Sequence, residues 1–481
     1  MRSSTFTIET VELAGTTEHF VQGGADLFPL LPQAFDGVAR IGVIGWGSQG
    51  PAQACNLRDS LRAAGSDTVV EIGLRAGSPS RAEAEALGFP VGDMIDVIGR
   101  SDMVLLLIAD AALAEGWAEL FAAMRPGTTA GLSHGFLQAW LDASGAAFPE
   151  HVSIIAVCPK GMGPSVRRLY EQGSGINCSV AVHHDVDGRA WDRALGWAIA
   201  IGAPYVFETT LRSEVRSDVF GERGVLLGAP HAIVESLYRR YTGLGEAPAA
   251  AFTRSTESLT GTLARAISRI GIRGAVDHLS GDERRQFEDA YCAAYPAMLS
   301  VLAEIYDEVA SGNELRSVVL AGRRLARFPL PTVEGTGMWQ VGAVVRSQRA
   351  EAEPPALDPM SAGMFCAAMM AQVDLLREHG HRWSEIANES VIEIVDSLIP
   401  FMHARGVASM IDGCSTTARL GARKWAPRFE AMIEQAVLPA VDSPGGARDD
   451  DLLKRFWSHP VHEVLETLLA YRPPVDIAVP A

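Results

Sequence analysis

Two pairs of acidic residues draw attention because the members of each pair are four positions apart. Asp218 and Glu222 form one pair, and Glu389 and Glu393 form the other. On a helix, positions i and i+4 share a face, so each pair presents two carboxylates together. Most acidic pairs at this spacing are surface charge, but here apolar residues flank both pairs. Hard oxygen ligands suit Mg²⁺, so these carboxylates are candidate ligands for this metal.

A glycine-rich loop near the amino terminus predicts a second kind of chemistry. The apolar stretch Ile41–Ile44 runs directly into Gly45-Trp46-Gly47-Ser48-Gln49-Gly50, and Pro51 suits the first turn of a following helix. In such a G-x-G-x-x-G loop, the first glycine permits the tight turn, the second lets the backbone approach a pyrophosphate, and the third lets helix and strand pack closely. We therefore expect a dinucleotide cofactor to contact Gly45, Gly47, Ser48, Gln49 and Gly50.

The end of the next predicted strand indicates which dinucleotide binds. An acid there would hold the ribose hydroxyls of NAD, whereas a cation would hold the extra phosphate of NADP. The strand Val69–Leu74 is followed by Arg75, Ser78 and Ser80, which suit a phosphate. Glu71 is the competing candidate, but it lies inside the strand. NADP is therefore favoured.

These candidate residues lie on two kinds of secondary structure. Short apolar strands alternate with helical stretches up to about residue 160, which predicts a doubly wound α/β domain of the Rossmann type. The expected strands are Ile41–Ile44, Val69–Leu74, Met103–Ile108, Thr129–Leu132 and Ile154–Val157. Past residue 210, long amphipathic stretches predict an all-α region. A segment rich in proline and glycine, Pro329–Pro359, is expected to connect two helical blocks.

The two helical blocks resemble each other. Thr256-Glu257-Ser258-Leu259 matches Asn388-Glu389-Ser390-Val391, while Gly261 stands where Glu393 has its counterpart. Chance similarity between amphipathic helices is the alternative to a duplication. We predict three domains, at residues 1–210, 211–355 and 356–481. We also expect one metal site per chain, because only the second block keeps both glutamates.

Composition and charge narrow the possible partners. The chain carries 41 Lys and Arg against 58 Asp and Glu, a net charge of −17, which disfavours nucleic acids and anionic membranes. Six cysteines show no metal-ligand or C-x-x-C spacing, so disulfides are not expected. The first residues lack an apolar signal core and a transit-peptide composition. We therefore expect a cytoplasmic enzyme that acts on a small molecule.

Several motifs taken together resemble one family, the long, plant-like form of the ketol-acid reductoisomerases. The resemblance runs over nearly the whole chain. The segments that carry it are Gly42–Pro51, Leu132–Phe136, Cys158–Pro164, Ser217–Gly224, Asn388–Glu393 and Asp412–Arg419.

The resemblance implies roles that residue spacing alone does not give. It implies a site for two Mg²⁺ ions at Asp218, Glu222, Glu389 and Glu393, with Asp218 bridging. It also implies polar residues around the metals and substrate, His134, Lys160 and Ser415, and an apolar substrate pocket, Leu226, Leu227, Leu398 and Cys414. A knotted helical domain and a homo-oligomer, either a dimer or a tetramer, are further implications.

The implied reaction converts 2-acetolactate or 2-aceto-2-hydroxybutyrate into a 2,3-dihydroxy acid for valine, leucine and isoleucine synthesis. An alkyl group migrates with the help of Mg²⁺, and NADPH then reduces the new keto acid. Glu393 is our first candidate to accept the hydroxyl proton, and a metal-bound hydroxide oriented by Lys160 is the alternative.

Two other functions are weighed against this one. A metal-independent, NADP-dependent hydroxyacid dehydrogenase would also join a Rossmann domain to helices. A protein that senses NADP without catalysis would keep only the nucleotide loop. The four acidic residues together with Lys160 disfavour both alternatives.

Overall fold

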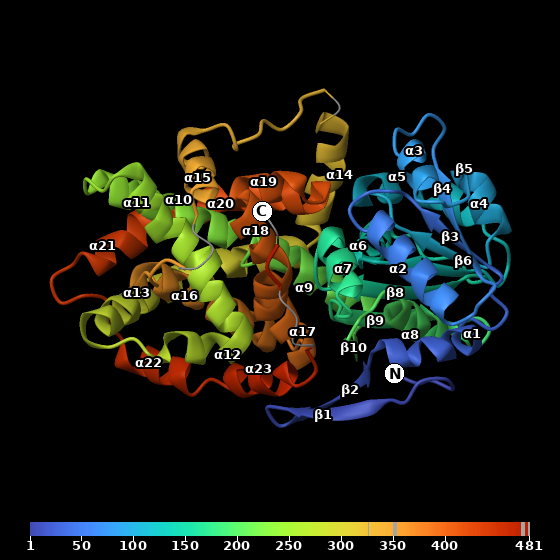
Figure 1. The fold of residues 1–481 in the computed structure, drawn as a ribbon, viewed down its shortest axis with the longest axis horizontal. Helices are drawn as coiled ribbons and strands as arrows, with labels where there is room; N and C mark the ends of the chain where they lie inside the picture. Colours follow the sequence, from blue (N-terminus) through green and yellow to red (C-terminus); the bar gives the residue numbers. More distant parts are fainter. Residues whose placement is uncertain (326, 350–353, 473–476, 480–481) are drawn as a thin grey trace. The chain divides into compact units, whose positions relative to one another are not determined.

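The chain folds into two compact units, and the computed structural model describes residues 1–325, 327–349, 354–472 and 477–479. The first unit comprises Met1–Arg216, Gly312–Arg327 and Tyr471–Val475. The second comprises Ser217–Ser311, Phe328–Ala470 and Asp476–Ala481. Figure 1 shows a sheet with its helices in the first unit and helices in the second.

The first unit is built on a ten-stranded sheet with the strand order β1-β2-β10-β9-β8-β7-β6-β3-β4-β5. The strands are β1 (Glu9–Leu13), β2 (Thr16–Gln22), β3 (Arg40–Ile44), β4 (Val69–Leu74), β5 (Val91–Asp93), β6 (Met103–Leu106), β7 (Thr129–Leu132), β8 (Ser153–Pro159), β9 (Cys178–His184) and β10 (Tyr205–Glu208). Six neighbouring strands of this sheet, β5, β4, β3, β6, β7 and β8, pair in parallel. Their order is that of a Rossmann fold, which confirms the predicted α/β class.

The rest of the sheet is mixed. β8 pairs antiparallel with β9, and the hairpin β1–β2 pairs antiparallel with β10. The strands β1, β2, β9 and β10 lie outside the five that we predicted, and they extend the sheet beyond the nucleotide-binding part.

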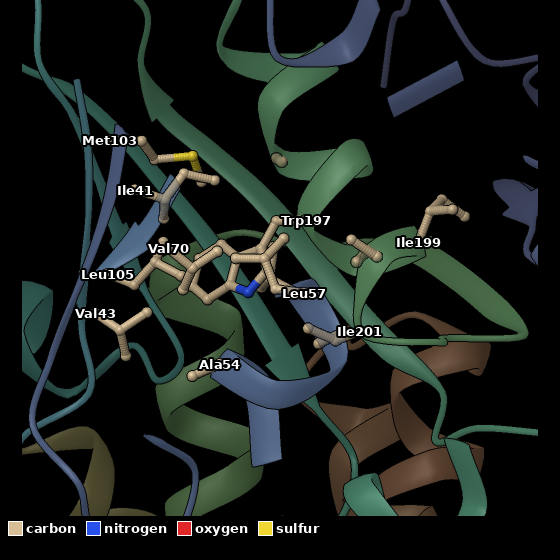
Figure 2. Close-up of a cluster of buried hydrophobic side chains, with 14 of the residues drawn as sticks. Ile41, Val43, Ala54, Leu57, Val70, Met103, Leu105, Trp197, Ile199 and Ile201 are labelled. Atoms are coloured by element: carbon tan, nitrogen blue, oxygen red, sulfur yellow. The ribbon is translucent and has the colours of Figure 1, made fainter. Parts of the chain in front are cut away.

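Helices cover both faces of this sheet because its central strands are apolar on both sides. They are α1 (Leu31–Ala34), α2 (Gly50–Ala63), α3 (Arg81–Ala86), α4 (Met94–Arg100), α5 (Asp110–Ala122), α6 (Phe136–Ser144), α7 (Gly163–Glu171) and α8 (Ala190–Ala200), with the 3-10 turn η1 (Ala25–Leu30). Figure 2 shows the core on one face, where Trp197 of α8 lies among Ile41 and Leu105 of the strands and Leu57 of α2. Trp197 also donates a hydrogen bond to Gln53 of α2 at 3.0 Å. The core therefore fixes α2, the helix that follows the glycine loop.

One helix of the first unit comes from far along the chain. α14 (Asn313–Leu325) packs on α5, and a Cβ at Gly322 would lie 2.9 Å from the Cβ of Ala111. Arg323 adds an ion pair to Glu115 at 2.6 Å. No local pattern predicts this placement, because the helices on either side of α14 in sequence belong to the second unit.

The second unit is helical, as predicted. Its elements are α10 (Gly228–Gly243), α11 (Pro248–Phe252), η2 (Thr253–Leu263), α12 (Ala264–Asp277), α13 (Gly281–Ala310), α15 (Gly337–Ser347), α16 (Pro359–Glu378), α17 (Trp383–Ala387), η3 (Asn388–Ile392), η4 (Ile394–Leu398), α18 (Ile399–Arg405), α19 (Val407–Gly413), α20 (Thr416–Met432), η5 (Ile433–Val437), α21 (Leu438–Val441), α22 (Asp450–Trp457) and α23 (Val461–Leu469). α9 (Leu211–Arg223) runs from the first unit into the second. The knot that the resemblance implies stays a prediction.

α16 is the central helix of this unit. It is long and apolar enough to cross a membrane, but 89% of its most apolar window is buried inside the protein. It packs closely along α13, since a Cβ at Gly363 would lie 2.6 Å from the carbonyl oxygen of Phe287. Such burial is that of a core helix.

The order of elements in the second unit supports the proposal of a duplication. α10 leads to the π-helical segment η2, and α16 leads through α17 to the π-helical segments η3 and η4. In each block, a helical segment interrupted by a glycine with positive φ then follows. This glycine is Gly271 (73°) in the first block and Gly406 (101°) in the second. Gly271 and Gly406 thus occupy matching positions in the two blocks. The expected connector Pro329–Pro359 contains the helix α15, and its residues 350–353 lie outside the described residues.

Candidate functional site

The glycine loop has the geometry that the motif predicts. Gly45 follows β3 with a φ of 105°, and a Cβ there would lie 2.5 Å from the carbonyl oxygen of Leu107. Gly50 opens α2, where a Cβ would lie 2.7 Å from the carbonyl oxygen of Gly45. Nothing lies within 4 Å of the Cβ position of Gly47, which leaves the backbone open to an approaching phosphate.

The segment that contains Lys160 supports this loop. The side-chain amide of Gln49 donates to the carbonyl oxygen of Gly161 at 2.9 Å. Gly163 packs so closely that a Cβ would overlap the carbonyl oxygen of Ser48. The predicted nucleotide loop and the predicted polar residue Lys160 therefore belong to one packed region of the first unit.

The residues expected to bind the extra phosphate of NADP lie just past the end of β4. Arg75 is exposed, and Ser78 and Ser80 are half-buried in the turn that precedes α3. Glu71 is buried inside the strand, and its carboxylate pairs with Arg100 and Arg40. These two arginines outweigh the effect of burial and lower the pKa of Glu71. Glu71 is thus engaged by the protein itself, which leaves Arg75 as the charged candidate.

Three of the four predicted metal ligands come together in the second unit. Asp218 of α9, Glu389 of η3 and Glu393 each offer one carboxylate oxygen, and these oxygens lie within 4.8 Å of one another. Glu389 and Glu393 are buried, at 0% and 7% exposure. Two carboxylates buried this close to a third need a cation nearby, so the donor set fits a hard divalent metal such as Mg²⁺.

Glu222, the fourth predicted ligand, lies outside that group among the described residues. Its Oε2 accepts a hydrogen bond at 2.8 Å from the guanidinium of Arg223, which is fully buried. The same guanidinium reaches the carbonyl oxygens of Val219 and Thr417. Glu222 thus has a fixed cationic neighbour within the protein.

The predicted pocket residues lie in the same unit. Leu226, Leu227 and Leu398 are buried. Burial, together with the charges of Glu222 and Glu393, raises the pKa of the Cys414 thiol to about 12. Ser415 is exposed and caps α20, since its hydroxyl accepts the N–H of Ala418 at 3.1 Å.

In the first unit, His134 and Lys160 share a partner that the sequence analysis missed. Glu214 of α9 is 1% exposed, and its carboxylate lies 3.3 Å from Nδ1 of His134 and 3.5 Å from Nζ of Lys160. Burial raises the pKa of Glu214, but His134, Lys160 and the N–H of Gly135 outweigh it and lower the pKa to about 2. A signal was present in the sequence, because Glu214, Asp218 and Glu222 recur every four residues.

Within the described residues, the first helical block does not repeat the cluster of Asp218, Glu389 and Glu393. Glu257 takes the place of Glu389, but its carboxylate accepts two hydrogen bonds from Arg349, both at 2.8 Å. Gly261 takes the place of Glu393, and a Cβ there would lie 2.7 Å from the imidazole of His403. A guanidinium and an imidazole thus occupy this region, which supports the proposal of one metal site per chain.

Comparison with known proteins places both parts of the chain in one family. Residues 38–205 match the family model described as the NADPH-binding domain of acetohydroxy acid isomeroreductase. Residues 211–351 match the one described as the C-terminal domain of ketol-acid reductoisomerase. The first unit is therefore a domain that binds a nicotinamide cofactor.

Two curated plant enzymes are similar over the full length. The chloroplastic ketol-acid reductoisomerase of Spinacia oleracea is 54% identical over 100% of this chain and 83% of its own length. The one from Pisum sativum is 53% identical over 100% of this chain and 85% of its own. This similarity confirms the long, plant-like resemblance.

Among solved structures, an NADH-preferring ketol-acid reductoisomerase from an uncultured archean is similar with a TM-score of 0.58. It covers 65% of this chain and 95% of its own, at 24% identity. At that identity, the similarity supports the fold alone.

The predicted cytoplasmic location is wrong by the same comparison. Both full-length relatives are named as chloroplastic enzymes, which points to a plastid. The prediction failed because targeting is determined by segments that are separate from the folded domains and their sites.

The matched domains and full-length relatives also decide against the two alternative functions, a hydroxyacid dehydrogenase and a non-catalytic sensor of NADP. The chain belongs to the ketol-acid reductoisomerase family, whose members are oxidoreductases that use a nicotinamide cofactor.

Proposed function

We propose that the chain converts 2-acetolactate and 2-aceto-2-hydroxybutyrate into the corresponding 2,3-dihydroxy acids, with Mg²⁺ and NADPH, for the synthesis of valine, leucine and isoleucine. The observation that carries this proposal is the cluster of Asp218, Glu389 and Glu393 within 4.8 Å, in a chain whose first unit binds a nicotinamide cofactor. A simple dehydrogenase has no need of such a cluster.

We propose that these three residues and Glu222 would hold two Mg²⁺ ions. Glu222 lies four residues after Asp218 on α9, which supports placing the fourth carboxylate on the same helix face as Asp218. When bound, the metal ions supply Lewis-acid polarisation of the substrate's ketone and hydroxyl oxygens.

The chain's own residues have distinct roles in this proposal. Glu393 is the first candidate to accept the proton of the substrate hydroxyl. The alternative acceptor is a hydroxide that Lys160 orients. Glu214 holds Lys160 and His134 in place, since its carboxylate is buried against both side chains. Glu214 and Asp218 lie four residues apart on α9, so this helix carries both the anchor of Lys160 and a metal ligand.

The apolar residues Leu226, Leu227 and Leu398, together with Cys414, line the part of the site that receives the migrating alkyl group. All three leucines are buried, and an apolar wall excludes water from the reacting atoms. Ser415, which follows Cys414 at the start of α20, completes the polar side of the site.

We propose NADPH as the preferred cofactor. Arg75 with Ser78 and Ser80 offers a cation and two hydroxyls at the end of β4, which suits the 2′-phosphate. Family membership alone leaves the choice open, since a solved relative is named as NADH-preferring. The competing acid Glu71 is paired with Arg100 and Arg40.

The remaining partner proposals follow from charge and family. A net charge of −17 disfavours nucleic acid and anionic membrane surfaces, and a homo-oligomer, dimer or tetramer, is expected. Sedimentation of the purified chain tests the oligomeric state directly.

The test of the function is NADPH oxidation by the purified chain with each of the two acids, with and without Mg²⁺. We expect turnover with both acids, dependent on Mg²⁺ and faster with NADPH than with NADH. Absence of turnover with either acid in the presence of Mg²⁺ would contradict the proposal.

A further inference from the structure

One buried side chain joins the two segments that carry the metal ligands. Gln372 lies in the middle of α16 and is 0% exposed. Its Oε1 accepts the backbone N–H of Val225 at 3.1 Å, and its Nε2 donates to the backbone carbonyl of Glu389 at 3.0 Å. Val225 comes three residues after Glu222, so one amide contacts both ligand-bearing segments.

Both partners of Gln372 lie where regular hydrogen bonding changes. α9 ends at Arg223, and the next N–H groups fall between α9 and α10. Glu389 lies in the π-helical segment η3, where the N–H of Glu393 bonds to the carbonyl of Asn388, five residues back. The amide of Gln372 contacts one buried backbone group at each of these places, the N–H of Val225 and the carbonyl of Glu389.

The backbone around the amide is shaped to admit it. A Cβ at Gly224 would lie 2.4 Å from Oε1 of Gln372, and a Cβ at Gly221 would lie 3.4 Å from the carbonyl oxygen of Glu389. Gly221 lies in the last turn of α9, and Gly224 directly follows the end of that helix. The opposite partners, a donor on one side and an acceptor on the other, also fix which way the amide points.

We propose that Gln372 is a positioning residue that sets the separation between the Asp218–Glu222 pair and the Glu389–Glu393 pair. This rests on the proposed metal site. Gln372 touches neither metal nor substrate in this proposal. It holds the end of α9 against the backbone of Glu389, so that carboxylates from two distant parts of the chain meet at a distance that suits Mg²⁺. Residues that orient metal ligands in this way commonly change metal affinity when replaced.

The test is the affinity of the full-length, chelator-treated chain for Mg²⁺ alone, measured by titration calorimetry. Gln372→Met keeps the length of the side chain and removes these two hydrogen bonds, together with the longer one from Nε2 to the hydroxyl of Ser390 at 3.5 Å. We expect its dissociation constant for Mg²⁺ to rise on the order of 10- to 100-fold, while the affinity for NADPH, bound in the other unit, stays unchanged.

Gln340→Met is the matched control, because Gln340 lies in the same unit, is exposed, and its side-chain amide donates to the carbonyl of Gly335. It should leave Mg²⁺ binding unchanged. A folded Gln372→Met variant that binds Mg²⁺ within about threefold of the wild type would overturn the proposal, since the expected loss is at least about tenfold.

Two further variants keep the outcome decisive. If Gln372→Met does not fold, Gln372→Asn is judged by the same limits, because its amide is shorter and reaches only one of the two partners. Glu389→Gln separates this proposal from the metal assignment on which it rests. Wild-type Mg²⁺ affinity in Glu389→Gln would refute the metal site, whereas loss there with none in Gln372→Met would refute only the role of Gln372.

Discussion

Arg349 donates two hydrogen bonds to the carboxylate of Glu257, from Nε to Oε2 and from Nη2 to Oε1, both at 2.8 Å. Glu257 stands in the first helical block where Glu389 stands in the second, and its side chain is 4% exposed. A fixed guanidinium thus neutralises the carboxylate in one block, while we propose that a metal ion does so in the other. This difference between the blocks makes Glu257 a natural control for the metal site.

Arg349→Met should destabilise the second unit strongly, because it leaves the Glu257 carboxylate buried without its main partner. Removal of one member of a buried pair costs about 3–5 kcal/mol. Urea unfolding measures the loss, and the double variant Glu257→Gln/Arg349→Met should recover most of it. If the single variant unfolds at the same urea concentration as the wild type, the ion pair has no structural role.

His403 should make the protein less stable in mild acid. Burial, with Arg349, Arg265 and Arg346 nearby, lowers the pKa of His403 from 6.5 to about 3. Between these values the unfolded chain binds a proton that the folded chain does not, so the free energy of unfolding falls as the pH drops from about 6.5 toward 3.

His403→Asn, which keeps a polar group near Thr260, should therefore flatten that dependence. Unfolding curves at several pH values between 7 and 4 measure it, with His278→Asn as a control at a position that is exposed. An unchanged slope in His403→Asn would show that His403 is not held neutral.

Arg75→Ala should shift cofactor preference toward NADH. Loss of a charge-assisted hydrogen bond to a phosphate is worth about 1.5–3 kcal/mol, or on the order of 10- to 100-fold in kcat/KM for NADPH. The value for NADH should change little. Arg62→Ala, an exposed arginine at the end of α2, is the control. Equal losses with NADPH and NADH in Arg75→Ala would argue against contact with the extra phosphate.

The nucleotide loop and the parallel strands could be predicted because their signals are local. The run Ile41–Ile44 and the glycines after it need only their neighbours to define a strand, a turn and a helix start. α14 could not be placed, because its packing on α5 joins residues about two hundred positions apart. The edge hairpin β1–β2 pairs with β10 in the same long-range way.

The site was predictable only in part for a similar reason. Asp218, Glu389 and Glu393 carry a spacing that suggests chemistry, and the structure brings them together. Glu214 gains its role from Lys160 and His134, which lie 54 and 80 residues before it. Gln372 gains its role from two backbone groups, which no side-chain pattern can reveal.

Lys160→Met should impair turnover without weakening metal binding. Lys160 is 2% exposed and pairs with Glu214, so the change removes a cation from the reacting region and leaves the carboxylate cluster intact. A group that takes part in proton transfer contributes on the order of 10²- to 10⁴-fold, and we expect a loss of kcat in that range.

Calorimetric titration of Lys160→Met with Mg²⁺ and NADPH checks that both affinities stay near those of the wild type. Glu214→Gln should lower kcat in the same direction, because it removes the anion that holds Lys160. A variant of Lys160 with wild-type turnover would remove this residue from the proposed mechanism.

The most direct test of the metal site compares Glu389→Gln with Glu257→Gln, the same change in the two helical blocks. We measure Mg²⁺ binding and Mg²⁺-dependent NADPH oxidation with 2-acetolactate, both per folded molecule. The proposal predicts that Glu389→Gln loses Mg²⁺ affinity and turnover by on the order of 100-fold or more, while Glu257→Gln keeps both within about threefold. Wild-type Mg²⁺ affinity and turnover in Glu389→Gln, or an equal loss in Glu257→Gln, would contradict it.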